Sequence, residues 1–153
     1  RVKQEVIKIN RQEKNIIIKN LETNEEYEES YDKLVLSPGA SPINPFKSLN
    51  SDKIRTLRNV EDSIEIKEYI EKNNVENVAI IGGGYIGVEL AENLSHFNNV
   101  KVTIIEKASH LIAPLDEDMS KFVYKVLANN GVNIILNNGV KEIINKNDKI
   151  FML

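Results

Sequence analysis

Three consecutive glycines at residues 82–84 follow directly after the apolar run 78–81 and most strongly limit how this chain can fold. Glycine loses more conformational freedom on folding than any other residue, and apart from proline it is the poorest helix former. The apolar run is typical of a strand buried inside a parallel sheet. Residues 86–95 have the apolar spacing of an amphipathic helix. The glycines therefore predict a sharp turn from a buried strand into a helix.

The chain from residue 59 onward alternates between helical and strand-like patterns. Further helices are expected within residues 59–73 and 116–131. Strand-like segments follow one another in chain order at 77–81, 101–106, 132–136, 140–144 and 149–153. The last two flank the turn-like residues 145–148 and are expected to pair antiparallel. This alternation indicates an α/β fold in which helices cover a parallel sheet.

The first 36 residues differ, because short β-branched runs occur there without a helical pattern. Strands are expected at 5–10 and 15–20, and the polar residues 21–30 are expected to lead into a third strand at 31–37. That third run is apolar without alternation, as in a strand covered on both faces. Residues 37–45 hold three of the four prolines and predict a break in regular structure, either a linker or a tight functional turn.

Composition excludes several classes of function. The net charge is −3 and the lysines and arginines are scattered, so the chain offers no basic surface for nucleic acid. The absence of cysteine excludes disulfides and thiol redox chemistry within these 153 residues. The spacing of the two histidines does not suggest a metal site. No apolar run approaches the roughly 20 residues of a membrane span, and we expect a cytoplasmic protein.

The glycine turn matches the dinucleotide-binding fingerprint Gly-x-Gly-x-x-Gly at Gly82, Gly84 and Gly87. Gly82 permits the tight turn, Gly84 lets the backbone approach a pyrophosphate, and Gly87 lets the helix pack closely on the strand. Amides at the start of the helix would face the phosphates, where the helix dipole favours negative charge. The alternative is a glycine-rich turn that binds nothing.

Glu106 ends the next expected strand, 19 residues after Gly87. This spacing suits an acid that accepts hydrogen bonds from the adenosine ribose, and the alternative is a solvated strand end. A carboxylate at this place repels a ribose 2′-phosphate, so we expect NAD(H) to be preferred over NADP(H). Lys107 beside it weakens that exclusion and leaves room for some use of NADP.

Three ordered motifs resemble the FAD-dependent pyridine nucleotide–disulfide oxidoreductases, and within them the coenzyme A-disulfide reductases, NADH oxidases and NADH peroxidases. The motifs are residues 31–42, 56–70 and 77–94. The resemblance implies a Rossmann-like three-layer NAD-binding domain with a parallel sheet and a β-meander, preceded by part of an FAD domain. The implied division is residues 1–47 for the end of the first FAD segment, 48–60 for a crossover, and 61–153 for an NAD(H)-binding domain truncated before its last strand.

The resemblance also assigns roles to individual residues. The residues implied to bind NAD are Gly82, Gly83, Gly84, Tyr85, Ile86, Gly87, Glu89, Glu106 and Lys107. Tyr85 falls where several members carry an aromatic lid over the flavin, and Glu89 matches a carboxylate near the nicotinamide end. Ser37, Pro38 and Gly39 match a loop near FAD in the intact enzyme. The alternatives are a surface tyrosine, an exposed helical acid and a plain strand-ending turn.

The resemblance implies a parent enzyme that passes hydride from NADH to FAD and on to a disulfide, peroxide or oxygen acceptor. The family's first glycine fingerprint for FAD, its redox cysteine and its C-terminal dimerisation domain have no counterpart in these residues. We therefore expect a fragment that binds NAD(H), holds no catalytic residue, and neither retains FAD nor oxidises NADH alone. The alternatives are a non-enzymatic redox-sensing module and a flavoenzyme of the ferredoxin or rubredoxin reductase type.

The apolar run 78–81 is expected to need a neighbouring strand on each side. Residues 101–106 supply one neighbour. We hypothesise that residues 33–37 supply the other, either within one chain or exchanged between two chains of a homodimer. Exchange of an equivalent element is a low-cost route to dimers, and an uncovered apolar strand is an aggregation hazard.

Overall fold

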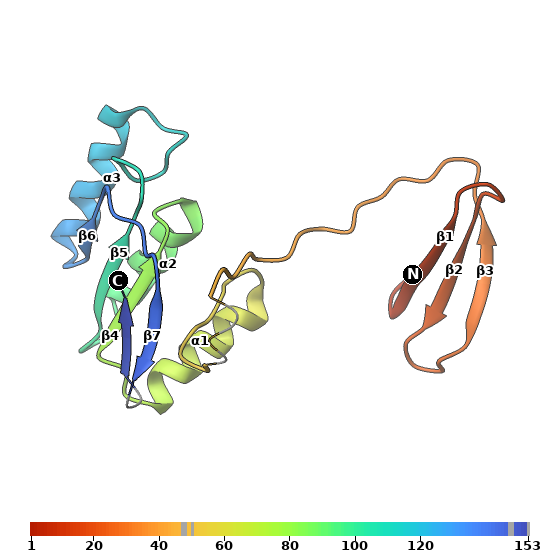
Figure 1. Cartoon of the computed structure of the whole chain (residues 1–153), viewed down its shortest axis with the longest axis horizontal. Coiled ribbons are helices and arrows are strands. Elements are labelled where there is room, and N and C mark those ends of the chain that lie inside the picture. The colour runs from red at the N-terminus through yellow and green to blue at the C-terminus, as the bar shows by residue number, and fades with distance from the viewer. Residues whose placement is uncertain (47–48, 50, 147–148, 153) are drawn as a thin grey trace. The chain divides into compact units, whose positions relative to one another are not determined.

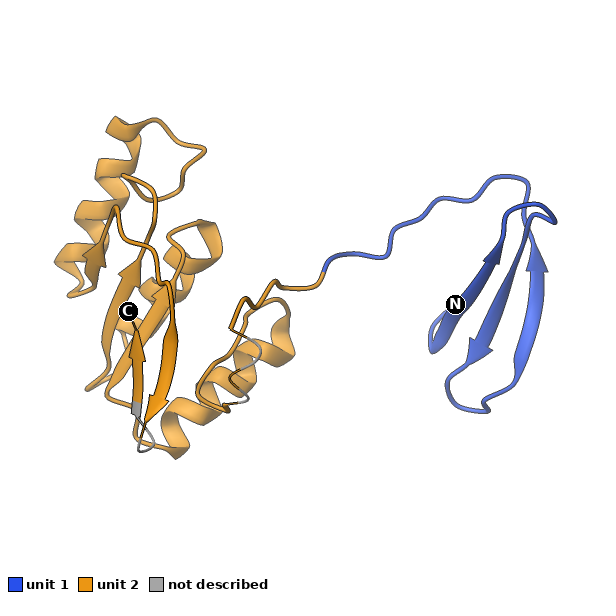
Figure 2. Cartoon of the chain, in the orientation of Figure 1, with its two compact units in different colours: residues 1–40 blue, residues 41–153 orange. Residues whose placement is uncertain are grey.

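The computed structural model of the chain describes residues 1–46, 49, 51–146 and 149–152. The backbone forms two compact units, Arg1–Ala40 and Ser41–Leu153, coloured separately in Figure 2. The expected boundary between residues 47 and 48 lies outside the described residues, as do residues 147 and 148 of the expected turn and the final Leu153. Each unit has its own strands (Figure 1).

The first unit is an antiparallel meander of β1 (Gln4–Asn10), β2 (Asn15–Asn20) and β3 (Glu26–Ser30). The central strand β2 pairs with both neighbours. Strands β1 and β2 confirm the sequence-based prediction, but the expectation of a polar connector is wrong for the residues of β3. Four of the five β3 residues are exposed, so the strand carries charges and no apolar alternation reveals it.

Residues 33–37 form no strand, which corrects the expectation of a buried third strand. Val35 and Leu36 are 84% and 66% exposed. Among the described strands none pairs with this segment, and without a ladder partner an apolar run stays irregular and open to solvent. Residues 78–81 belong to the other unit, so the hypothesised pairing stays a prediction, both within one chain and exchanged between two chains.

The second unit is built on a parallel sheet in the order β4–β5–β6, formed by β4 (Asn77–Ile81), β5 (Lys101–Ile105) and β6 (Asn133–Ile135). β4 and β5 are paired along their whole length. β5 is the central strand, while β4 pairs with β5 alone among the described residues. Strand β5 buries Val102 and Ile104 completely or nearly so, as expected of a strand covered by helices.

Three helices accompany this sheet in the described part of the unit. α1 (Val60–Lys72) begins at a capping box, in which the Asn59 side chain accepts the N–H of Asp62 at 2.8 Å and the Asp62 carboxylate accepts the N–H of Asn59. α2 (Tyr85–Ser95) joins β4 to β5 and packs on both, and α3 (Glu117–Asn129) joins β5 to β6 and packs on β6 and α2.

The buried side chains of the second unit form one core between the helices and the sheet: Ile70, Ile80, Val88, Ala91, Leu94, Val102, Ile104, Leu111, Ile112, Leu127 and Val132. Each fully buried aliphatic side chain contributes about 1.5–3 kcal/mol to folding. Two of these residues, Leu111 and Ile112, lie in the loop between β5 and α3 rather than in a helix or strand. The core therefore holds that loop in place.

The chain continues after β6 into the antiparallel pair β7 (Ile143–Lys146) and β8 (Lys149–Met152), with Ile143 opposite Met152. This pair and the parallel sheet confirm the expected α/β fold. None of the described helices combines the length and the apolar composition that a membrane span requires. The described residues contain no cluster of acidic, histidine or cysteine side chains arranged to hold a metal ion.

Candidate dinucleotide-binding site

The three glycines make the whole connection between β4, which ends at Ile81, and α2, which begins at Tyr85. Gly82 has φ +106°, a left-handed conformation that residues with a side chain rarely adopt. Its N–H donates to the carbonyl oxygen of Ile105 at 2.9 Å and so extends the pairing of β4 with β5. The chain therefore turns at Gly82 while the N–H of this residue stays bonded to β5.

Gly87 lies in the first turn of α2, where the helix passes close to the turn itself. A Cβ atom at Gly87 would lie 2.0 Å from the carbonyl oxygen of Gly82 and 3.4 Å from Cγ2 of Ile80. The first distance is far below any non-bonded contact, and the obstacle is backbone that cannot rotate away. The absence of a side chain at Gly87 is therefore a requirement of helix–strand packing.

The start of α2 is open to solvent. Its N-cap residue, Gly84, is exposed, and no atom lies within 4 Å of an added Cβ. The N–H groups in the first turn of any helix lack an intrahelical acceptor. Here no side chain caps them, no acidic residue lies in the first turn, and Tyr85 and Ile86 are 57% and 55% exposed. This helix end can therefore bind an anion.

Glu106 directly follows β5 and lies beside the glycine turn. Its Oε2 accepts the N–H of Gly83 at 2.6 Å, and its Oε1 accepts the N–H of Ala108 at 2.6 Å. Partial burial acts to raise the pKa of Glu106, but the N–H groups of Ala108, Gly83 and Lys107 and the nearby His110 hold it below the ordinary value of 4.5. A carboxylate has about four lone-pair sites, so sites remain for ribose hydroxyls.

The lowered pKa of Glu106 makes part of the folding stability depend on pH. The folded chain binds this proton more weakly than the unfolded chain, so the contribution is full above about pH 4.5 and is lost as the pH falls through the lower folded-state pKa. We expect Glu106→Gln to lower the unfolding free energy by about 1–2 kcal/mol at neutral pH and by much less in acid.

Urea unfolding at a series of pH values measures this effect. Glu89→Gln is the control, because Glu89 is an exposed acid on α2 that lies outside the turn. A loss of the same size at every pH would show that the carboxylate charge of Glu106 does not contribute.

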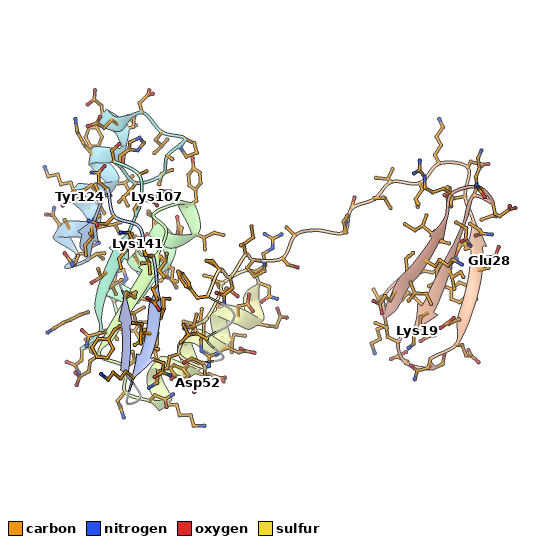
Figure 3. The ribbon with its side chains drawn as sticks, viewed as in Figure 1. Lys19, Glu28, Asp52, Lys107, Tyr124 and Lys141 are labelled. Atoms are coloured by element: carbon orange, nitrogen blue, oxygen red, sulfur yellow. The ribbon has the colours of Figure 1, made fainter. Side chains whose placement is uncertain are left out.

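The remaining residues predicted to bind NAD lie around the turn. Tyr85 and Glu89 are both exposed and lie one helical turn apart on α2. Lys107, labelled in Figure 3, follows Glu106, and its side chain passes beside Gly139, where an added Cβ would lie 3.7 Å from Cδ of the lysine. The structure therefore brings the glycine turn and Glu106 together, whereas the Lys107 side chain lies beside Gly139.

The residues predicted to lie near FAD belong to the first unit. Ser37, Pro38 and Gly39 are exposed and lie outside helices and strands. Gly39 has φ +75°, which a glycine adopts without strain. Their proposed role near a flavin stays a prediction.

Sequence reasoning missed the loop after Glu106. The N–H of Ile112 donates to the carbonyl oxygen of Gly83 at 2.7 Å, and Leu111 lies against the same glycine. With its N–H bonded to Glu106, Gly83 therefore uses both backbone groups within the protein, although it was predicted as a cofactor-binding residue. Ile112 has φ +50°, which no sequence pattern marks at a β-branched residue. The apolar residues 111 and 112 were the one feature of the sequence that could have indicated a buried loop here.

Comparison with known proteins identifies the family to which this chain belongs. A family model described as "Pyridine nucleotide-disulphide oxidoreductase" matches residues 1–153. The chain belongs to this family. Coenzyme A disulfide reductase of Staphylococcus haemolyticus (strain JCSC1435) is 37% identical over 123 residues, which cover 80% of this chain and 27% of that protein. The chain thus spans about a quarter of the length of the curated relatives that it matches.

Solved structures agree with this assignment. Reduced CoADR-RHD of Bacillus anthracis matches with a TM-score of 0.80 and 39% identity, covering 97% of this chain and 28% of that one. The water-forming NADH oxidase of Lactobacillus brevis, solved with NADH bound, matches with a TM-score of 0.79 and 25% identity, covering 98% and 33%. The resemblance drawn from the sequence motifs to a family of FAD-dependent flavoprotein oxidoreductases is confirmed.

Proposed function

We propose that this chain is the NAD(H)-binding portion of a flavoprotein oxidoreductase. The observation that carries the proposal is the carboxylate of Glu106, which the N–H of Gly83 holds beside the glycine turn at 2.6 Å. An acid suited to a ribose thereby lies next to a helix start suited to a pyrophosphate. The similarity to an NADH oxidase solved with NADH supports the same conclusion.

The chain's own residues would bind and orient the nucleotide. The first N–H groups of α2, at Tyr85 and Ile86, would donate to the pyrophosphate, and the exposed Gly84 would allow its close approach. Glu106 would accept the ribose hydroxyls. Tyr85 and Glu89, on one face of α2, would lie toward the nicotinamide end. When bound in the intact enzyme, NADH supplies a hydride and FAD accepts it.

The division of the chain follows from this assignment. We propose that residues 61–153 form the NAD(H)-binding domain, residues 48–60 a crossover, and residues 1–47 the end of the first FAD-domain segment, with 37–39 near the flavin of the intact protein. The intact protein would pass electrons from FAD to a disulfide, peroxide or oxygen acceptor. Exchange of residues 33–37 between two chains would give a homodimer.

The environment of Glu106 favours NAD(H) over NADP(H). Both carboxylate oxygens accept backbone N–H groups, so the charged group is held in place and cannot easily turn away from a 2′-phosphate. Its lowered pKa keeps it ionised at neutral pH. Lys107 partly offsets this repulsion, because its positive charge follows directly in the chain.

We expect the 153-residue chain to bind NADH about tenfold or more tightly than NADPH, a difference of about 1.4 kcal/mol per factor of ten. Fluorescence titration of both reduced nucleotides at one ionic strength measures the two affinities. The nicotinamide absorbance of the same samples should stay constant with time, because these residues contain neither the family's glycine fingerprint for FAD, the hydride acceptor, nor a cysteine. Equal or reversed affinities would remove Glu106 from its role, and no binding of NADH would overturn the proposed function.

A further inference from the structure

Leu111 fills the space against Gly83. The leucine side chain is completely buried, and Gly83 is buried as well. A Cβ atom at Gly83 would lie 2.5 Å from Cδ2 of Leu111 and 3.2 Å from Cβ of Glu106. Gly83 is therefore enclosed between the leucine and the acid, with no room for a side chain.

The loop that carries Leu111 is itself anchored. The carbonyl oxygen of Leu111 accepts the hydroxyl of Ser120 at 2.7 Å, and Ser120 is a buried residue of α3. On the other side, the N–H of Ile112 donates to the carbonyl oxygen of Gly83 at 2.7 Å. Ile112 adopts its left-handed conformation at this bond, which is uncommon for a β-branched residue. Tertiary contacts therefore determine the shape of this loop.

These contacts form a continuous connection from the core to the nucleotide turn. Ser120 holds the backbone of Leu111, the leucine side chain and the Ile112 amide hold Gly83, and Gly83 donates to the carboxylate of Glu106. A shift of Gly83 would move the N–H group that orients the acid and the peptide that leads into the first turn of α2.

We propose that Leu111 is a positioning residue, which fixes Gly83 so that the glycine turn and Glu106 are arranged for the dinucleotide. The inference rests on the function proposed above. In this role, Leu111 contacts no atom of the nucleotide and acts on the site only through Gly83. The pairing of a buried leucine with the middle glycine goes beyond the fingerprint, which assigns roles to Gly82, Gly84 and Gly87.

The test uses Leu111→Ala in the 153-residue chain, with Leu111→Val as the milder truncation in case the alanine variant does not fold. Under conditions in which the variant is fully folded, its affinity for NADH should be about tenfold lower than that of the wild type. Amide hydrogen exchange by NMR gives a second measurement without nucleotide. The Gly83 amide should exchange about tenfold faster than in the wild type, relative to the Ile104 amide of the central strand.

Leu127→Ala is the matched control, because Leu127 is a leucine of the same core and is 2% exposed. The control should lower global stability and leave both the NADH affinity of the folded chain and the relative exchange of Gly83 unchanged. If Leu127→Ala changed both as much as Leu111→Ala, or if Leu111→Ala changed neither, the positioning role would be overturned.

A double variant separates an action through Gly83 from a general loosening. In Gly83→Ala the new methyl group meets Cδ2 of Leu111, and the double variant Gly83→Ala/Leu111→Ala removes that atom. The double variant should therefore bind NADH better than Gly83→Ala alone, and additive losses would contradict the proposal. If the wild type bound no NADH, the function proposed above would fail, while the exchange of the Gly83 amide would still decide whether Leu111 fixes this glycine.

Discussion

Gly87→Ala is expected to lower the unfolding free energy by about 3 kcal/mol and to abolish most NADH binding. The added methyl group would lie 2.0 Å from the carbonyl oxygen of Gly82. Because this oxygen belongs to the turn backbone, α2 must move away from β4 or the turn must open. Either movement displaces the helix N–H groups that are proposed to bind the pyrophosphate.

Gly84→Ala should separate binding from stability. No atom lies within 4 Å of a Cβ at Gly84, and its φ of −75° suits any residue. Alanine is a poorer N-cap than glycine, so we expect a loss of about 1 kcal/mol or less in stability. NADH affinity should nevertheless fall about tenfold or more, because the methyl group would occupy the surface that the pyrophosphate is proposed to approach.

Thermal or urea unfolding and NADH titration of both variants provide the comparison. Gly139→Ala is the control for glycine replacement as such, because its nearest contact would be an ordinary one, 3.7 Å from the Lys107 side chain. If Gly84→Ala lost as much stability as Gly87→Ala, the expected separation of binding from stability at Gly84 would be wrong. A Gly87→Ala chain as stable as the wild type would contradict the helix–strand contact itself.

The second unit could be predicted from sequence because its elements carry strong local patterns. The strands β4 and β5 are apolar runs, and the apolar spacing within residues 59–73 predicted α1, which begins at Val60 after its N-cap Asn59. The glycine spacing predicted the turn, and the position of Glu106 after β5 predicted an acid near it. Each of these features can be recognised from a local sequence pattern.

The parts that could not be predicted depend on long-range contacts. β3 is a charged strand that forms because β2 offers it a pairing edge, whereas residues 33–37 look like a strand in sequence and are irregular in the described structure. In the site, the bond from Gly83 to Glu106 joins residues 23 apart in the chain. The contact between Gly83 and Leu111 is of the same kind. A single sequence contains no local signal for such contacts.

Glu106→Ala is expected to reduce the preference for NADH over NADPH by about tenfold or more. The substitution removes the proposed acceptor for the ribose hydroxyls, and hydrogen bonds to a charged group contribute about 1.5–3 kcal/mol each. NADH should therefore bind more weakly. NADPH loses less, because the change also removes the repulsion between the carboxylate and the 2′-phosphate, and Lys107 remains to attract that phosphate.

Two further variants divide this effect into its parts. Glu106→Gln keeps the size of the side chain and removes its charge, so the part of the preference that it abolishes is electrostatic. In the wild type, this electrostatic part of the preference for NADH should become smaller as the salt concentration is raised, because ions screen interactions between exposed charges. Glu89→Ala is the control: Glu89 is an exposed acid on α2 that is proposed to lie toward the nicotinamide end, where NADH and NADPH are identical. Its loss should change both affinities alike. An unchanged preference in Glu106→Ala would mean that discrimination between the two nucleotides does not depend on this carboxylate.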